Sequence, residues 1–226
     1  DAKGLLKAAI RSDNPVLVFE NKLLYPTTGP VPDEGEEVLV PLGVADVKRP
    51  GRDATVVALG AATGKALEAA QALEAEGIDA EVVDLRTLVP LDVATIVRSV
   101  VRTGRLVTVE DAPLTHGFGA EIVSRVAEAA FGALRAAPKR VAALDVPIPY
   151  NSELENAALP DVASINRAVQ EVVRGCGRGP GPDDGADRGD AGHKHGRRGG
   201  GADRLRGGRQ LGRRLHAVLL RRTARG

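Results

Sequence analysis

Residues 54–85 read ATVVALGAATGKALEAAQALEAEGIDAEVVDL, and this stretch alternates between two structural periods. The short runs TVVAL at 55–59 and AEVVDL at 80–85 are each interpreted as a strand. Between them, apolar residues recur at helical spacing from an expected N-cap at Thr63 to a stop at Gly77. The residues expected to face inward in this helix are Ala66, Leu67, Ala70 and Leu73. The order strand, helix, strand predicts a right-handed crossover and a parallel pair.

The same alternation continues to residue 173. Asp92 is expected to cap a helix that ends at Gly104, and Asp161 to cap the closing helix. The expected inward residues are Ile96, Val97, Val100 and Val101 in the first helix, and Ile165, Ala168, Val169 and Val172 in the second. Further strands are expected at 106–109 and 140–144, with a helix at 120–134 between them. Residues 54–173 therefore predict a three-layer α/β domain, a mostly parallel sheet with helices on both faces.

The first residues of the chain predict a smaller unit. Residues 3–11 have the apolar spacing of a helix that ends before Pro15. The apolar run 16–19 follows directly and predicts a buried strand. A helix that leads into a buried strand is typical of the last αβ unit of a domain, so we expect residues 1–25 to be the end of a preceding domain.

Residues 26–53 join these two parts. They contain five prolines and the acidic run 33–37. Because proline interrupts the hydrogen bonding of a helix interior, no long helix can persist there. We expect an interdomain linker with one short strand near 43–48.

Charge divides the chain near residue 173. Residues 1–173 carry 17 basic against 25 acidic side chains, a balance of −8, whereas 174–226 carry 14 against five, a balance of +9. The second part is rich in Gly and Arg and poor in apolar residues, which predicts a disordered tail. Its charge would suit non-specific nucleic-acid binding, but it has no aromatic residue. GC-rich DNA translated in a wrong frame gives the same composition, and we favour an inert or frameshifted tail.

The composition also limits the kinds of site and the cellular location that we expect for the protein. The chain has a single cysteine, Cys176, and no methionine. A lone cysteine excludes an intrachain disulfide and a thiolate-rich metal site. No stretch approaches the ~18 apolar residues of a membrane span, and the start has no secretory signal pattern. We therefore expect a cytoplasmic protein, and the missing initiator methionine predicts a fragment of a longer chain.

Two glycine-containing stretches match phosphate-binding motifs only in part. Residues 60–65, GAATGK, follow a predicted strand, but a P-loop needs four residues between its glycines and a Ser or Thr after Lys65. Residues 117–122, GFGAEI, place Ile122 where a dinucleotide fingerprint needs its third glycine. We expect a tight turn at the first stretch and close helix packing at the second.

His116 is the one histidine of residues 1–173. It lies beyond the strand at 106–109, where ligands of open α/β sheets tend to bind. Glu110 and Asp111 precede it, so an imidazole oriented by a carboxylate is one hypothesis. No serine or cysteine stands in a recognisable nucleophile turn nearby. A loop histidine without a chemical role is the interpretation that we favour.

The end of the predicted helix at 3–11 is a second candidate site. Its last carbonyl groups have no partner within the helix and lie at the negative end of the helix dipole. Backbone oxygens of this kind could bind a hard monovalent cation, and they could equally be satisfied by water. Without a bound ion as evidence, we expect water to hydrogen-bond to these carbonyl groups.

Seven blocks of sequence, in order across residues 1–173, resemble the β subunit (E1β) of the thiamine-diphosphate-dependent 2-oxoacid dehydrogenases that act on pyruvate or branched-chain 2-oxoacids. The blocks are KGLLKAAIRSDNP (3–15), FENKLLY (19–25), VPLG (40–43), VDLRTLVPLD (83–92), VEDAP (109–113), GFGAEI (117–122) and VPIPY (146–150). The block at 84–92 is shared with transketolase-type C-terminal domains in general.

The resemblance implies that residues 1–25 end a pyrimidine-binding domain and that 54–173 form a complete transketolase C-terminal-like domain. It implies an α₂β₂ heterotetramer that decarboxylates a 2-oxoacid and transfers the acyl group to lipoyl-E2. Thiamine diphosphate would lie between the α subunit, which also holds Mg²⁺, and β residues upstream of Asp1. No catalytic or cofactor-binding residue is therefore assigned to this chain, and the fragment alone is expected to be inactive. The domain would instead supply the β–β contact and a docking surface for the basic subunit-binding domain of E2.

The resemblance also implies a metal site. Related β subunits hold a structural potassium ion with main-chain oxygens, which map onto Ala9, Ile10, Ser12 and Asn14. Ser12 replaces the family's usual Asp, a change that a carbonyl ligand tolerates. In two other departures, His116 replaces a common Gly and Val44 replaces a usual Lys.

Two alternatives to this interpretation stay open. One is the C-terminal part of a transketolase-like synthase, in which both halves lie on one longer chain. The other is a non-catalytic module that only docks E2 or a second β subunit. The identity of the 2-oxoacid does not follow from these residues.

Overall fold

The computed structural model describes residues 1–29, 31 and 37–175. The predicted disordered tail lies outside these residues from 176 onward, as does most of the acidic run of the linker. The helices are α1 (Ala2–Ile10), α2 (Ala62–Glu74), α3 (Val93–Thr103), α4 (Phe118–Ala130), α5 (Ser152–Ala158) and α6 (Val162–Arg174), with short 3₁₀ helices η1 (Lys22–Leu24) and η2 (Phe131–Ala133). The strands are β1 (Asp46–Arg49), β2 (Ala54–Ala58), β3 (Ala80–Asp84), β4 (Leu106–Pro113) and β5 (Lys139–Ala143).

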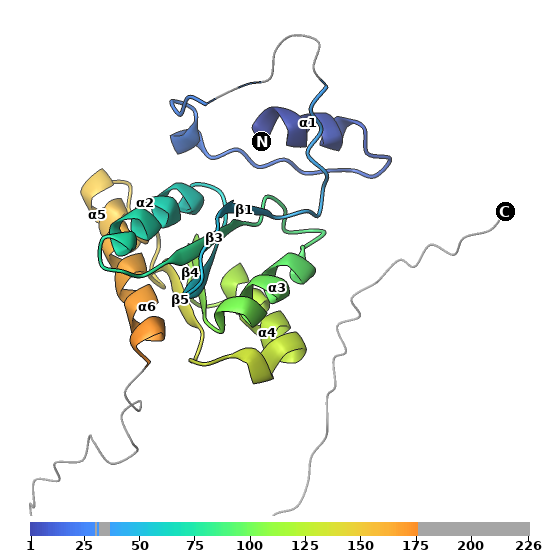
Figure 1. Ribbon diagram of the computed structural model, residues 1–226. Coiled ribbons are helices and arrows are strands. Elements are labelled where there is room, and N and C mark those ends of the chain that lie inside the picture. The colour runs from blue at the N-terminus through green and yellow to red at the C-terminus, as the bar shows by residue number, and fades with distance from the viewer. Residues whose placement is uncertain (30, 32–36, 176–226) are drawn as a thin grey trace, which may run out of the picture. The chain divides into compact units, whose positions relative to one another are not determined.

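The strands form a five-stranded sheet in the order β1-β3-β2-β4-β5. Strand β2 is parallel to both of its neighbours, β3 and β4, and β5 is parallel to β4. The edge strand β1, expected near 43–48, pairs antiparallel with β3. Figure 1 shows helices on both sides of this sheet. The predicted three-layer, mostly parallel α/β domain is therefore confirmed.

Each face of the sheet packs on two helices. Val56 and Val82 belong to the core formed with α2 and α6, whereas Val57 and Val83 belong to the core formed with α3 and α4. Neighbouring residues of a strand point to opposite faces, so a strand buried on both faces needs apolar residues in succession. This requirement explains the Val-rich sequences of β2, β3 and β4.

The predicted helix boundaries in the domain follow their capping residues. The Asp92 carboxylate accepts from the Thr95 backbone N–H, and α3 ends at Gly104 in the left-handed conformation, with φ of +74°. At α6, Asp161 and Ser164 form a reciprocal capping box. All four residues expected to face inward in α6 are buried.

Two predicted details of the helices are wrong. Thr63 does not cap α2, because the chain is already helical at Ala61, which is the N-cap, and Thr63 is buried inside the helix. Val101 is exposed and Val97 only half-buried, since the buried face of α3 is centred on Ile96 and Val100. Two helices end earlier than expected: α2 ends at Glu74, before Gly77, and the helix expected over 120–134 is α4 to Ala130 followed by η2. Strand β4 continues to Pro113, and α5 and η1 were not expected.

The strand predicted at 16–19 is not formed. Residues 15–20 have no regular secondary structure, and Leu17 and Phe19 are 82% and 89% exposed. No strand of the described residues pairs with this run, so it has no sheet on which to bury its side chains. The preceding helix is confirmed as α1. The assignment of residues 1–25 to the end of another domain stays a prediction. No helix in the described stretches is long and apolar enough to cross a membrane.

Candidate functional site

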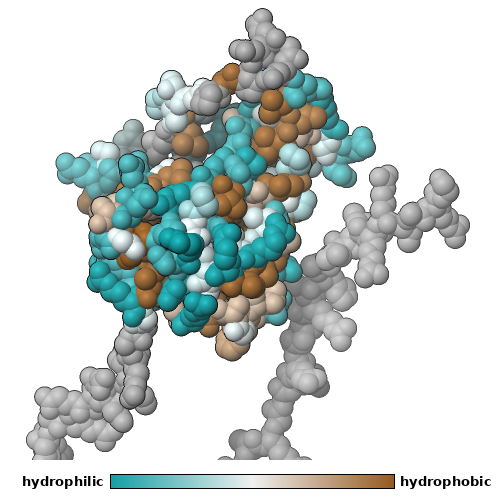
Figure 2. Space-filling model, in the orientation of Figure 1, coloured by the Kyte–Doolittle hydropathy of each residue, from teal (hydrophilic) through white to brown (hydrophobic). Residues whose placement is uncertain are grey.

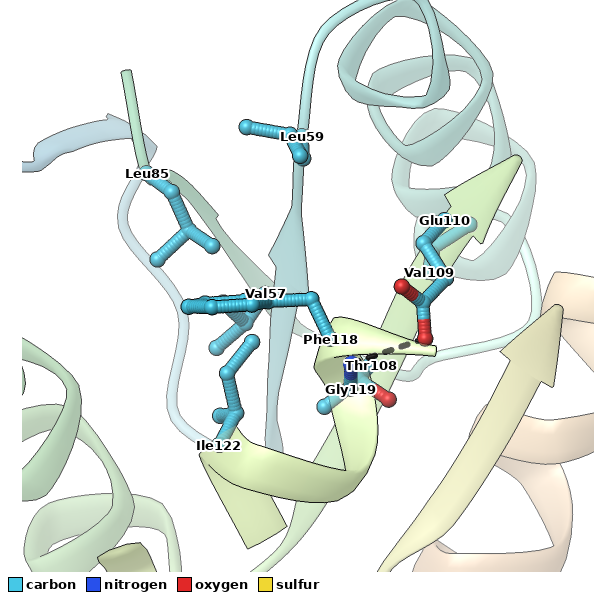
Figure 3. A pocket seen from close by; sticks show the side chains of 9 residues that line it. All are labelled: Val57, Leu59, Leu85, Thr108, Val109, Glu110, Phe118, Gly119 and Ile122. Atoms are coloured by element: carbon cyan, nitrogen blue, oxygen red, sulfur yellow. Dashed lines mark hydrogen bonds between the residues drawn. The ribbon is translucent and has the colours of Figure 1, made fainter. Parts of the chain in front are cut away.

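The carboxyl ends of β2 and β4 mark the point where the strand order reverses, because β3 follows on one side of β2 and β4 on the other. Open α/β sheets bind their ligands in the crevice at this point. A cavity of about 10 Å³ lies here between β2, β3, β4 and α4 (Figure 3). It is lined by Val57, Leu59, Leu85, Thr108, Val109, Glu110, Phe118, Gly119 and Ile122. This volume is about that of one water molecule, so protein side chains fill most of the crevice.

The GAATGK stretch at 60–65 forms the tight turn that the sequence predicts. Gly60 has φ of +59°, a left-handed conformation that glycine adopts without steric cost. The Lys65 ammonium donates to the carbonyl oxygen of Pro160 at 2.8 Å. Lys65 therefore ties α2 to the segment before α6 and is not directed at a phosphate site.

The GFGAEI stretch at 117–122 packs closely at the start of α4, as expected. Glu110, on β4, is only 5% exposed, and its Oε1 accepts from the Gly119 backbone N–H at 2.8 Å (Figure 3). A Cβ atom at Gly117 or Gly119 would lie 2.6 or 2.7 Å from this oxygen. The two glycines are thus required by a carboxylate of the chain itself.

His116 is exposed and has φ of +63°, in the left-handed region that favours glycine. Asp145 holds the turn, because its carboxylate accepts from the Thr115 backbone N–H at 2.8 Å and from the Thr115 hydroxyl at 2.6 Å. These hydrogen bonds from Thr115 hold the pKa of Asp145 below its ordinary value. Glu110 hydrogen-bonds to α4, and in the described part of the chain no carboxylate is hydrogen-bonded to the His116 ring. The interpretation without a chemical role stays the favoured prediction.

The block at 84–92 is a loop fastened by two side chains. Thr87 Oγ1 accepts from the Gly43 N–H at 3.1 Å, and Asp92 Oδ2 accepts from the Ala45 N–H at 3.0 Å. Burial acts to raise the pKa of Asp92, but hydrogen bonds from Thr95 and Ala45 outweigh it and hold that pKa below its ordinary value. The loop therefore fixes the end of the linker against the domain. The sequence analysis did not predict that Thr87 and Asp92 hold the linker, although polar side chains inside this block could have indicated it.

A second cavity, of about 580 Å³, lies between β5, α5 and α6. Its size is that of a ligand pocket. Its charged lining residues are Lys139, Arg140, Arg167, Asp145, Asp161 and Glu171. The charges are balanced in sign, and Lys139 pairs with Glu171 at 2.7 Å, so the lining selects neither anions nor cations. Sequence reasoning missed this groove because α5, which forms one wall, was not expected.

The four residues of the predicted potassium site are the last two residues of α1, Ala9 and Ile10, and two residues that follow the helix, Ser12 and Asn14. The Ala9 carbonyl accepts from the backbone N–H groups of Arg11 and Ser12. Among the described residues, no backbone N–H donates to the carbonyls of Ile10, Ser12 or Asn14. Carbonyl oxygens are hard donors, so their type suits a hard cation, and the potassium site stays a prediction.

Comparisons with known proteins address the same residues. A family model described as transketolase, C-terminal domain, matches residues 43–165. The pyruvate dehydrogenase E1 component subunit beta of Rhizobium meliloti (strain 1021) is 49% identical over 172 residues, which are 76% of this chain and 37% of the relative. The corresponding mitochondrial subunit of Pisum sativum is 47% identical over 180 residues, 79% of this chain and 49% of the relative. The chain thus spans half or less of the length of these relatives.

Among solved structures, one titled split gene transketolase, inactive beta4 tetramer, is similar with a TM-score of 0.53 and 34% identity. The match covers 64% of this chain and 46% of that chain. The similarity therefore extends over most of the described residues.

Proposed function

Because the chain belongs to the transketolase C-terminal domain family, we propose that it is part of the β subunit of a pyruvate dehydrogenase E1 component. The observation that carries this proposal is the 49% identity to such a subunit over 172 residues. The E1 component decarboxylates the 2-oxoacid oxidatively and transfers the acyl group to the lipoyl group of E2. The cytoplasmic location stays a prediction, because the relatives include a bacterial and a mitochondrial subunit.

Thiamine diphosphate would supply the carbanion that attacks the 2-oxo carbon. The described residues do not fit this cofactor, because the crevice at the end of β2 and β4 is nearly filled. In the described part of the chain, no group of three or more His, Cys, Asp or Glu is placed to hold a metal ion such as Mg²⁺. We propose that the α subunit and the part of the relatives beyond this match supply both sites, so no catalytic step is assigned to these residues.

The role that we propose for this chain is assembly. Large apolar side chains reach the surface at the loop of 84–92 and after β5, where Val89 is 91% exposed and Tyr150 fully exposed. Figure 2 likewise shows apolar side chains among the polar ones on one face of the molecule. Such side chains gain stability when a second subunit covers them. An α₂β₂ heterotetramer with the E1 α subunit would provide this cover.

Docking of E2 is the second part of the proposed role. Residues 1–173 carry a balance of −8, and the family's E2 subunit-binding domain is basic. Complementary charge speeds association and selects partners, and it weakens with salt. Association with the E2 domain is therefore expected to slow as ionic strength rises.

A potassium ion on the main-chain oxygens of Ala9, Ile10, Ser12 and Asn14 would tie the end of α1 to the residues that follow it. Thermal unfolding of the whole chain in KCl and in tetramethylammonium chloride, at equal ionic strength, tests this site. A higher melting temperature in KCl alone supports it. Equal melting temperatures in the two salts contradict it.

A reconstitution experiment tests the proposed function as a whole. The chain is mixed with an E1 α subunit and with an E2 subunit-binding domain, and complex formation and pyruvate decarboxylation are measured. Binding to either partner without turnover supports the assembly role. Absence of binding to both partners, with a full-length β subunit binding in parallel, contradicts it.

The transketolase-like alternative rests on the 34% identity to the split gene transketolase. It predicts association with the complementary half of a transketolase and no association with an E1 α subunit. The same binding assay, with that half as an additional partner, separates the two interpretations.

A further inference from the structure

Helix α4 begins at the crevice where this class of sheet usually binds a ligand. It is 13 residues long, and its N-cap, Gly117, has no side chain with which to cap the first turn. The free N–H groups and the dipole of such a helix end favour an anion. In dinucleotide-binding folds the anion is a phosphate of the ligand.

Here the anion is part of the chain. The Glu110 carboxylate reaches from β4 to the Gly119 N–H at 2.8 Å, as the dashed line in Figure 3 marks. The space it occupies exists because Gly117 and Gly119 have no Cβ, which would approach Oε1 to 2.6 and 2.7 Å. The glycine pair that resembles a nucleotide fingerprint thus accommodates an internal carboxylate.

A second polar group is buried at the same place. Thr108 is 1% exposed, and its Oγ1 has no hydrogen-bond partner among the described residues. A Cβ atom at Gly119 would lie 2.6 Å from this hydroxyl, so the hydroxyl faces the start of α4 beside Glu110. Both side chains line the 10 Å³ cavity. A buried hydroxyl without a partner costs stability; the Glu110 carboxylate does not hydrogen-bond to it, and a free oxyanion in place of the Glu110 side chain would give it a partner.

We propose that the start of α4 is an anion site filled by the Glu110 carboxylate, and that removal of this side chain opens it to a small oxyanion. The ligand class is a carboxylate or phosphate of few atoms, held by the Gly119 N–H, the helix dipole and the Thr108 hydroxyl. In the intact chain Glu110 acts as the positioning residue that fixes α4 to β4 and closes the crevice to nucleotides. This inference needs no partner subunit, so it stands apart from the proposed function.

The test is the thermal unfolding of Glu110→Ala in formate, acetate or inorganic phosphate, with chloride at equal ionic strength as reference. The variant is expected to melt below the unmodified chain, and formate or acetate is expected to raise its melting temperature saturably, by about 4 °C. The unmodified chain and Glu121→Ala, which removes an exposed carboxylate from the same helix, are expected to show no such response. The double variant Glu110→Ala, Thr108→Val is expected to respond more weakly.

Two outcomes overturn the proposal. One is a Glu110→Ala variant as stable as the unmodified chain; the other is a response to all three oxyanions no greater than that to chloride. If Glu110→Ala fails to fold, the proposal is tested with Glu110→Gln, whose amide keeps an oxygen that can accept from the Gly119 N–H but has no negative charge. Hydrogen exchange at the Gly119 N–H is then expected to accelerate roughly fivefold to tenfold. Unchanged exchange at Gly119 overturns the proposal as well.

Discussion

The α/β domain at 45–174 and the run at 16–19 contain similarly apolar sequences but bury them to very different extents. Val82 and Val83 of β3 are fully buried, whereas Val16–Phe19, an equally apolar run, is exposed. The difference lies in what surrounds each run. Strand β3 has a neighbouring strand on each side and helices on both faces, while no described strand pairs with 16–19.

This contrast shows that an apolar run is buried only where a second apolar surface packs against it. Burial stabilises by roughly 25 cal/mol per Å² of apolar surface, and this gain exists only where a second surface is present. The domain, residues 45–174, contains both surfaces of the contacts in its core. The run at 16–19 supplies only one surface among the described residues, which is the arrangement expected of a segment that packs on further protein.

Leucine truncation in each region should produce the largest difference. Leu73 of α2 is fully buried, so Leu73→Ala leaves a cavity and is expected to lower the free energy of unfolding by about 4 kcal/mol. Leu17→Ala removes an exposed side chain and should change it by less than about 0.5 kcal/mol. Urea unfolding of both variants measures the two effects. Equal losses would mean that residues 16–19 are packed in solution.

The second largest difference in stability between the regions should come from replacing one arginine in each. The Glu81 carboxylate is fully buried, receives a hydrogen bond from Thr55 at 3.2 Å and pairs with Arg102. Arg102→Met leaves this carboxylate without its cation and is expected to cost about 3 kcal/mol in urea unfolding. The matched variant Arg11→Met removes the exposed partner of Glu37 and should have little measurable effect. An Arg102→Met variant as stable as the unmodified chain would show that solvent reaches Glu81.

A capping variant should have a smaller effect that depends on pH. Hydrogen bonds from Ser164 hold the pKa of Asp161 below its ordinary value of about 3.9. Asp161→Ala is expected to lower the stability at pH 7 by about 1 kcal/mol. Because the pKa in the folded state is depressed, this contribution is complete well above pH 4 and is lost as pH falls through the folded pKa. The stability difference should therefore shrink in unfolding measurements below about pH 4, and a constant difference would contradict this account.

The smallest effect should be a gain. His116 occupies a left-handed conformation with φ of +63°, which costs a residue with a Cβ about 1 kcal/mol. His116→Gly removes this cost but increases the entropy of the unfolded chain, so a net stabilisation of about 0.5 kcal/mol is expected. His116→Ala keeps the Cβ and serves as the control. Comparable melting temperatures for the two variants would show that the backbone at 116 relaxes in solution.

The domain could be predicted from the sequence because each of its signals is local. Asp92 and Asp161 cap helices with residues three positions away, and Gly104 ends α3 through its own backbone. Signals that depend on distant residues failed. The run 16–19 has the composition of a buried strand, but no pattern within it reports whether another strand is present.

The candidate site divides in the same way. The glycine spacings at 60–65 and 117–122 were enough to argue against nucleotide motifs. Glu110 of β4 and Gly119 of α4 are nine positions apart, and the hydrogen bonds of Thr87 and Asp92 to the linker span more than 40 positions. Sequence spacing contains no information on such contacts. A carboxylate directly after the apolar start of a buried strand, as at Glu110, is a signal that could have directed attention there.

The two edge strands of the sheet have a consequence for behaviour at high concentration. Strand β1 is short, charged at Asp46, Lys48 and Arg49, and interrupted by a register shift, and β5 begins with Lys139 and Arg140. Charged, short or irregular edges prevent strands of different molecules from adding to one another. The sheet is therefore protected against aggregation through its edges. Concentrated solutions of the chain are expected to remain free of fibrils that grow from this domain.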